Sequence, residues 1–159
     1  KLHEAINTRG KEYYANLQAD KLVNQVTAPI NFDNHIINGE FSASGKAVGG
    51  HSTAGVNSNV RIERLVSVSS NGVRTADISI FDPNTNQWIL KVKRDGITPQ
   101  ETTLFPEHWT PNRIKVEVDF AYKNRIISQT RRNMWEGITP SGIKVEGYIA
   151  PNTTVYPLP

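Results

Sequence analysis

The sequence predicts an α+β domain in which antiparallel sheet is packed against one or two helices. Three observations support this prediction. Short segments of alternating apolar and polar residues recur along the chain, and turn-forming residues separate them as in hairpins. A segment near the N-terminus has a helical spacing of apolar residues. The pair Thr110-Pro111 has the residue types that begin helices.

The composition is that of a folded domain of ordinary size. The chain has 159 residues, of which 37% are hydrophobic and 21% charged, enough to bury a substantial core. It has no cysteine, which excludes disulfides and cysteine-based metal or nucleophile chemistry. The net charge of +3 mildly favours an anionic partner such as RNA. No apolar run is long enough to span a membrane, so we expect no membrane partner.

The N-terminal segment is expected to form one amphipathic helix that covers the sheet. Tyr14, Leu17 and Val23 follow a helical spacing between Gly10 and Val26, and Pro29 ends the pattern. We therefore divide the chain into an N-terminal helical segment, residues 1–30, and a sheet-centred domain, residues 31–159. Because the chain begins with lysine and not with methionine, we expect it to be a piece of a larger protein.

A three-stranded meander is predicted in the middle of the chain. Strands are expected over Val60–Val68, Thr75–Phe81 and Gln87–Lys93, because each has period-two or β-branched character. The turns between them are Ser69–Gly72, which contains Asn-Gly, and Asp82–Asn86. Antiparallel pairing of neighbouring strands follows from these short connections.

The segment after Thr110-Pro111 is ambiguous from its pattern alone. Ile114, Val116, Val118 and Phe120 alternate as in a strand, although the spacing also fits a helix. The threonine and proline favour a helix, since threonine caps helices and proline is tolerated at their first position.

The last part of the chain is expected to add further strands. We predict strands at Ile126–Thr130, Ile143–Ile149 and Thr153–Tyr156, and turns at Trp135–Gly137 and Ser141-Gly142.

Two of the four histidines, His35 and His51, lie in the glycine-rich stretch Asp33–Ser52. Histidine titrates near neutrality, so a pair can supply one neutral base and one charged acid. If this stretch is a hairpin, its turn centres on Ala43 and the two rings approach each other across adjacent strands. Two surface histidines without a function are the alternative.

Lysines occupy one face of the third meander strand. Period two places Lys91 and Lys93 with Ile89 on the face opposite Trp88, Leu90 and Val92. Such lysines either serve a site or protect a sheet edge.

The order of these features resembles the bacterial branch of the EndoU family. The resemblance runs from about Asn31 to Pro159. It rests on His35-x15-His51, the Val-Gly-Gly-His-Ser setting of the second histidine, a strand lysine, and the terminal Gly-Tyr-Ile and Thr-Val-Tyr-Pro. It implies an EndoU or barnase-like ribonuclease fold. It also implies a metal-independent endoribonuclease that cleaves RNA at uridine and leaves 2′,3′-cyclic phosphate and 5′-hydroxyl ends.

The resemblance also implies roles for single residues. His51 is expected to take the proton of the RNA 2′-hydroxyl, and His35 to protonate the departing 5′-oxygen. Lys91 is expected to neutralise charge on the phosphorane, with Lys93 as the alternative because the alignment after these lysines is loose. Thr154 and Tyr156 are expected to bind the base, the first by its hydroxyl and the second by stacking.

A further histidine and a pair of arginines lie outside this assignment of roles. His108, just before the helix start, is expected to be structural. Arg131-Arg132 either contacts phosphate or faces water. No spacing of metal ligands or nucleotide-binding motif is present, so we expect no cofactor and no metal.

Members of the family are frequent as toxin domains of contact-dependent inhibition and other polymorphic toxin systems. The resemblance therefore implies delivery from a cell surface or by secretion within a larger toxin, and action in the cytoplasm of a target cell. It implies RNA, with tRNA as one candidate, as substrate and a cognate immunity protein as partner. The alternative from another functional class is a non-catalytic β-rich binding or adhesion module whose histidines are incidental.

Overall fold

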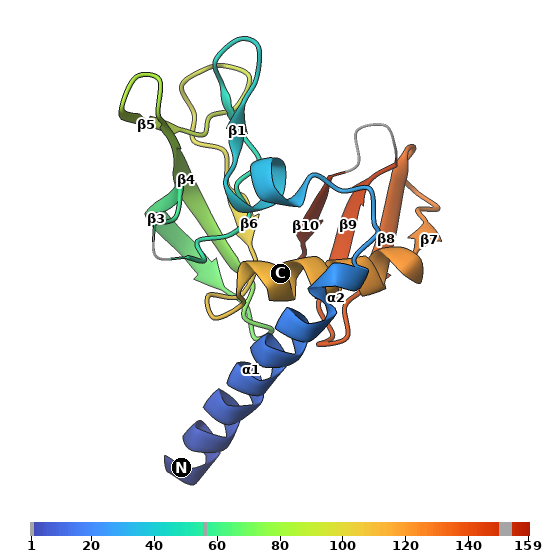
Figure 1. Ribbon diagram of the computed structural model, residues 1–159. Coiled ribbons are helices and arrows are strands. Elements are labelled where there is room, and N and C mark those ends of the chain that lie inside the picture. The colour runs from blue at the N-terminus through green and yellow to red at the C-terminus, as the bar shows by residue number, and fades with distance from the viewer. Residues whose placement is uncertain (1, 56, 150–153) are drawn as a thin grey trace.

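The computed structural model describes residues 2–55, 57–149 and 154–159 and has the α+β class with antiparallel sheets that the sequence predicts (Figure 1). The helical elements are α1 (Leu2–Leu22), η1 (Val23–Gln25), η2 (Phe32–Ile37) and α2 (Pro111–Lys123). The strands are β1 (Glu40–Phe41), β2 (Ala47–Val48), β3 (Val60–Val68), β4 (Arg74–Asp82), β5 (Gln87–Leu90), β6 (Thr102–Leu104), β7 (Ile126–Ile127), β8 (Met134–Ile138), β9 (Lys144–Tyr148) and β10 (Val155–Pro157).

The first sheet is built around β4. β3 and β5 flank it, and β6 pairs with its first residues, beyond the end of β5. The predicted meander is therefore present, with β6 as an addition that the sequence did not indicate. Alternate residues of β4, Ala76, Ile78 and Ile80, are fully buried and form a small core with Val60 and Leu104.

The second sheet has the strand order β10-β9-β8-β7, with every pair antiparallel. β9 lies within the predicted strand, and β7 is shorter than predicted because it ends at Ile127. The predicted last strand begins at Val155 in the structure, and Thr153 lies outside the described residues. In Figure 1 the two sheets stand on either side of the molecule, with α2 running across it.

The prediction of a turn at Trp135–Gly137 is wrong, because these residues belong to β8 in the interior of the second sheet. Trp135 is fully buried. A Cβ at Gly137 would lie only 2.6 Å from the carbonyl oxygen of Ala121 in α2. Glycine is present here because the helix backbone approaches the strand closely, and not because the chain turns.

α2 confirms the helical alternative for the segment after Thr110. The Thr110 hydroxyl accepts a hydrogen bond from the backbone N–H of Arg113, and Pro111 occupies the first helical position. Ile114, Val118 and Ala121 share one fully buried face of the helix.

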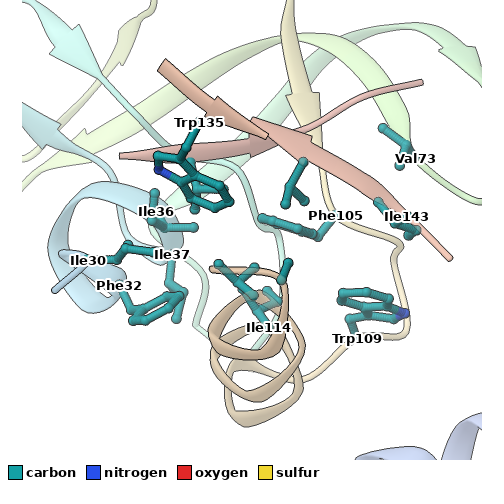
Figure 2. Packing of buried hydrophobic residues seen from close by; sticks show 14 residues of the cluster. Ile30, Phe32, Ile36, Ile37, Val73, Phe105, Trp109, Ile114, Trp135 and Ile143 are labelled. Atoms are coloured by element: carbon teal, nitrogen blue, oxygen red, sulfur yellow. The ribbon is translucent and has the colours of Figure 1, made fainter. Parts of the chain in front are cut away.

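The main core lies between α2, η2 and the second sheet. Figure 2 shows Ile114 of α2 below Phe105 and Trp135, with Phe32 and Ile36 beside them. Each large apolar side chain buried in this way contributes about 1.5–3 kcal/mol of stability. This core fixes η2, and with it His35, against the second sheet.

α1 differs from its prediction in extent and in position. It ends at Leu22, earlier than the predicted Val26, and begins well before Gly10. It packs against α2 and not on a sheet, and its N-terminal half leads away from the body of the molecule (Figure 1). Polar contacts join the two helices, among them a hydrogen bond of 3.0 Å from Asn112 to Asp20. The apolar residues of α1 are too few to form a face that would cover a sheet.

Candidate active site

Backbone pairing brings His35 and His51 to one place. His35 lies in η2, a single turn of π-helix whose wider hydrogen-bonding pattern is frequent at functional sites. Its carbonyl oxygen accepts from the N–H of Gly50 at 2.8 Å, and the N–H of His51 donates to the carbonyl oxygen of Ile36 at 2.6 Å. The two histidines thus lie on segments that are directly hydrogen-bonded to each other.

The predicted geometry of the hairpin between the histidines is wrong in detail. β1 and β2 pair Glu40 with Val48 and Phe41 with Ala47, so the turn centres on Ser44 and not on Ala43. The histidines lie outside these two short strands, and their rings are not a cross-strand pair. The residues of η2 follow no regular spacing of apolar side chains, so the sequence pattern did not reveal this helical turn.

Gly49 allows this close pairing. Its φ is +72°, and a Cβ on it would lie 2.0 Å from the carbonyl oxygen of His35. Only glycine combines this backbone conformation with the absence of a side chain. The Gly-Gly-His sequence is therefore a requirement of the contact between the two histidine segments.

A cleft of about 480 Å³ opens beside the two histidines. Its lining includes the predicted site residues His35, His51, Lys91, Thr154 and Tyr156. A volume of this size is within the usual range of small-ligand sites. The last strand of the second sheet thus meets the histidine segment and the first sheet at one cavity.

His51 is buried and held by its ring nitrogen. Nδ1 lies 2.7 Å from the carbonyl oxygen of Thr103, which can only accept, so Nδ1 carries the proton and Nε2 is the acceptor of the neutral ring. Burial, aided by the charge of Lys91, lowers the pKa of His51 from 6.5 to about 3. His51 is therefore neutral at pH 7 in a fixed tautomer.

His35 is more exposed and has a carboxylate neighbour. Burial lowers its pKa, while the charge of Glu40 opposes this effect. Its Nδ1 lies 3.9 Å from Glu40 Oε2. Of the two histidines, His35 is the one whose protonated form has an anionic partner.

The structure separates the two candidate lysines. Lys91 is buried, its Nζ donates to the carbonyl oxygen of Gly49 at 2.9 Å, and burial lowers its pKa to about 8. Lys93 is exposed and lines a different depression with Arg64 and Asp77. The period-two pattern ends here because the backbone of Lys91 still pairs with β4, whereas that of Lys93 pairs with Thr98. Only Lys91 joins the histidines.

Thr154 and Tyr156 both line the cleft, as their spacing on one strand predicts. Thr154 directly precedes β10. The Tyr156 ring lies near that of His51, with centroids 6.0 Å apart and planes inclined by 28°. An aromatic ring and a histidine thus form adjacent parts of the cleft wall.

The sequence assigned no role to several residues of this region. Lys46, Arg94 and Tyr148 line the cleft, and Glu40 is beside His35. Lys46 Nζ donates to the carbonyl oxygen of Arg94 at 3.2 Å, which ties the β1-β2 hairpin to the loop after β5. Only Tyr148 lay within a motif that the resemblance rested on. The others carry no sequence signal that distinguishes them from surface residues.

The remaining sequence candidates are not themselves part of this lining. His108 Nε2 is 2.6 Å from Glu12 Oε2 of α1, a structural contact as predicted. Arg131 forms an ion pair with Glu146 at 2.8 Å, and Arg132 is exposed.

Within residues 2–55, 57–149 and 154–159, no group of three or more histidine and carboxylate side chains is arranged to hold a metal ion. In the same part of the chain, none of the helices is both long and apolar enough to cross a membrane.

Comparison with known proteins gives one family. The model of the family described as "Bacterial EndoU nuclease" matches residues 30–159. Comparisons with the curated proteins and with the solved structures returned no match. The matched region contains both sheets, α2 and every residue of the cleft named above.

Proposed function

The chain belongs to the bacterial EndoU nuclease family, which makes it an endoribonuclease, and on this basis we propose that it cleaves RNA at uridine through the 2′-hydroxyl of the substrate. The observation that carries the proposal is the convergence of His35, His51 and Lys91 on one cleft. These three groups can handle the two proton transfers and the charge that such a reaction requires.

His51 is proposed as the base. Its Nδ1–H is fixed on Thr103, so the lone pair of Nε2 is available to take the proton of the 2′-hydroxyl as that oxygen attacks phosphorus. A low pKa makes the free ring a weak base. The phosphate of bound RNA would raise this pKa, because a nearby anion favours the imidazolium.

His35 is proposed as the acid. It would give its proton to the 5′-oxygen while the bond from phosphorus to that oxygen breaks. Glu40 and the substrate phosphate both favour the protonated ring that this role needs. The products are a 2′,3′-cyclic phosphate and a 5′-hydroxyl. His51 has then gained the proton of the 2′-hydroxyl, and His35 has lost one to the 5′-oxygen.

Lys91 is proposed to stabilise the phosphorane. One N–H of its ammonium group is bound to Gly49, and an ammonium group has three donors. The remaining donors can meet the oxygens on which negative charge develops. A charge held in a mostly buried site acts more strongly than one in water.

Thr154 and Tyr156 are proposed to select and hold the base. A hydroxyl can donate to a uracil carbonyl and accept from the imide N–H. Stacking on an aromatic ring contributes about 1–3 kcal/mol per base. Both residues line the same cleft as the histidines, so a bound uridine would place its ribose near them.

We also propose that the nuclease acts as a toxin in the cytoplasm of a target cell, after delivery by secretion or from a cell surface within a larger protein. Its substrates in the cell would be RNAs, with tRNA as the first class to test. The producing cell then needs a cognate immunity protein, and a partner that covers the cleft would meet Lys46 and Arg94 at its rim.

The test uses a short RNA with a single uridine and the same RNA with 2′-deoxyuridine at that position, both in EDTA. The unmodified protein should cleave only the all-ribose RNA and leave a cyclic phosphate, and His51→Ala should cleave that RNA at least about 10²-fold more slowly. Cleavage of the deoxyuridine RNA at that position would refute attack by the 2′-hydroxyl. Equal cleavage beside all four bases would refute uridine preference.

A further inference from the structure

The hydroxyl group of Tyr156 is bound within the second sheet. Tyr156 lies directly opposite Glu146 in the pairing of β10 with β9. Its hydroxyl donates to Glu146 Oε1 at 2.6 Å. Hydrogen bonds of this length from a hydroxyl to a carboxylate are charge-assisted and stronger than neutral ones. The hydroxyl is therefore already engaged before any ligand enters the cleft.

Arg131 holds the same carboxylate. Its Nη1 donates to Glu146 Oε1 at 2.8 Å and lies 3.5 Å from the Tyr156 hydroxyl. The Glu146 side chain is only 15% exposed, whereas 57% of the Arg131 side chain is exposed. Glu136 lies directly opposite Glu146 on β8, so a second carboxylate is near. The guanidinium thus balances the charge of Glu146 and limits its movement.

The Tyr156 side chain connects these contacts with the cleft, because its hydroxyl binds Glu146 and its ring lines the cleft wall. The ring lies 6.0 Å from the His51 ring, measured between centroids, and lines the same cavity. Freeing the hydroxyl would let the ring rotate about its side-chain bonds, and the wall beside His51 would move with it.

We propose that Glu146, held by Arg131, is a positioning residue that fixes the ring of Tyr156 beside His51. This inference rests on the proposed function, in which Tyr156 contacts RNA. Glu146 acts through the phenol hydroxyl and touches no substrate. In this arrangement Tyr156 offers the RNA its ring face, and the hydroxyl serves only to orient the ring.

A double-mutant cycle in the full chain tests this role. Glu146→Ala should raise the KM for a uridine RNA several-fold, with a smaller change in kcat. In the background of Tyr156→Phe, which keeps the ring and lacks the hydroxyl, the same substitution should change KM little, since the two residues act through one contact. Glu146→Gln should retain most of the affinity because its amide oxygen still accepts. Glu136→Gln, on the neighbouring strand, is the matched control for loss of a carboxylate.

Two outcomes of the cycle would overturn the inference. An equal rise in KM for Glu146→Ala in both backgrounds would show that Glu146 acts independently of the hydroxyl. Loss of cleavage in Tyr156→Phe alone would show that the hydroxyl itself contacts the RNA.

A titration separates this inference from the proposed function. Burial, followed by the bond to Glu146, raises the pKa of Tyr156 to about 12. The chain has 5 tyrosines, so the difference in absorbance between the protein and Tyr156→Phe isolates this phenol. Its pKa should fall in Glu146→Ala, and an unchanged pKa would refute the contact. If the unmodified protein cleaves no RNA, the proposed function fails while the titration still decides whether Glu146 holds Tyr156.

Discussion

The ammonium group of Lys91 donates a hydrogen bond of 2.9 Å to the carbonyl oxygen of Gly49. Gly49 is also the residue whose missing side chain lets the His35 carbonyl approach, and it lies two residues before His51. One glycine therefore connects three candidate catalytic residues from distant parts of the chain. The expected consequences can be measured residue by residue.

Gly49→Ala should be strongly destabilising. A Cβ there adds an overlap at 2.0 Å with the His35 carbonyl to the strain of φ +72°. Gly45→Ala is the matched control, because its φ is +82° and no atom lies within 4 Å of the added carbon. We expect the free energy of unfolding to fall by about 1–2 kcal/mol in Gly45→Ala, from strain alone, and by about 3 kcal/mol or more in Gly49→Ala. Denaturant unfolding gives both values, and equal losses would show that the contact with His35 is unimportant.

His35→Ala and His51→Ala should each reduce the rate of RNA cleavage by about 10²- to 10⁴-fold, since each removes one proton transfer. Single-turnover kinetics on a uridine RNA measures this loss. His108→Ala removes a histidine that pairs with Glu12 away from the cleft and should leave cleavage nearly unchanged. A fully active His35 or His51 variant would remove that residue from the mechanism.

Lys91→Ala should reduce kcat far more than Lys93→Ala. Lys91 lies in the cleft with the histidines, whereas Lys93 lines a separate depression. Loss of one group that stabilises transition-state charge typically costs about 10²- to 10³-fold in kcat. Steady-state kinetics of the two variants distinguishes the lysines. A greater loss in Lys93→Ala would contradict the arrangement proposed for the cleft.

The stability of the protein should fall between pH 7 and pH 5 in part because of His51. The folded-state pKa is lowered from 6.5 to about 3, so in this window the unfolded chain binds a proton that the folded protein does not. This contribution is fully present above pH 6.5 and is lost as the pH falls. Between pH 7 and pH 5 the free energy of unfolding should fall by about 2 kcal/mol more in the unmodified protein than in His51→Gln, as measured by denaturant unfolding at both pH values. Parallel pH profiles would show that His51 is not held neutral.

Thr154→Val should weaken the preference for uridine over cytidine. The substitution keeps the shape of the side chain and removes the hydroxyl proposed to bond the base. We expect the ratio of kcat/KM for the two RNAs to fall by up to about tenfold, the value of one good hydrogen bond. Thr130→Val, on an exposed loop, serves as the control. An unchanged ratio would assign base selection to other residues.

The sequence was most informative where alternation and turn chemistry agree. β4 was predicted because it alternates and β3 because it is rich in β-branched and other apolar residues, and Asn71-Gly72 supplies the turn between them, in which Gly72 has φ +90°. β8 was missed because glycine at position 137 suggested a turn. Glycine is needed there because the backbone of Ala121 lies so close to the strand. A contact between elements distant in sequence leaves no local pattern.

Some residues of the candidate site could likewise be predicted from the sequence, and others depend on tertiary contacts. Histidine identity and spacing, with the resemblance, indicated His35 and His51, but the helical turn that carries His35 follows no period. The choice between Lys91 and Lys93 depended on where β5 leaves β4, and this is set by tertiary pairing. Glu146 could not have been found, because its importance comes only from its position opposite Tyr156.

The cleft is lined by residues of the segment that carries the histidines, of the chain directly after β5 and of the last strand of the second sheet. Contacts between residues so far apart in sequence have a high contact order, and such contacts form slowly because long loops must close first. The candidate site therefore exists only once the whole domain has folded. A chain that has been unfolded, for instance to pass through a pore, would regain activity at the rate of its slowest long-range pairing. Refolding kinetics would then set the delay before the first RNA is cut.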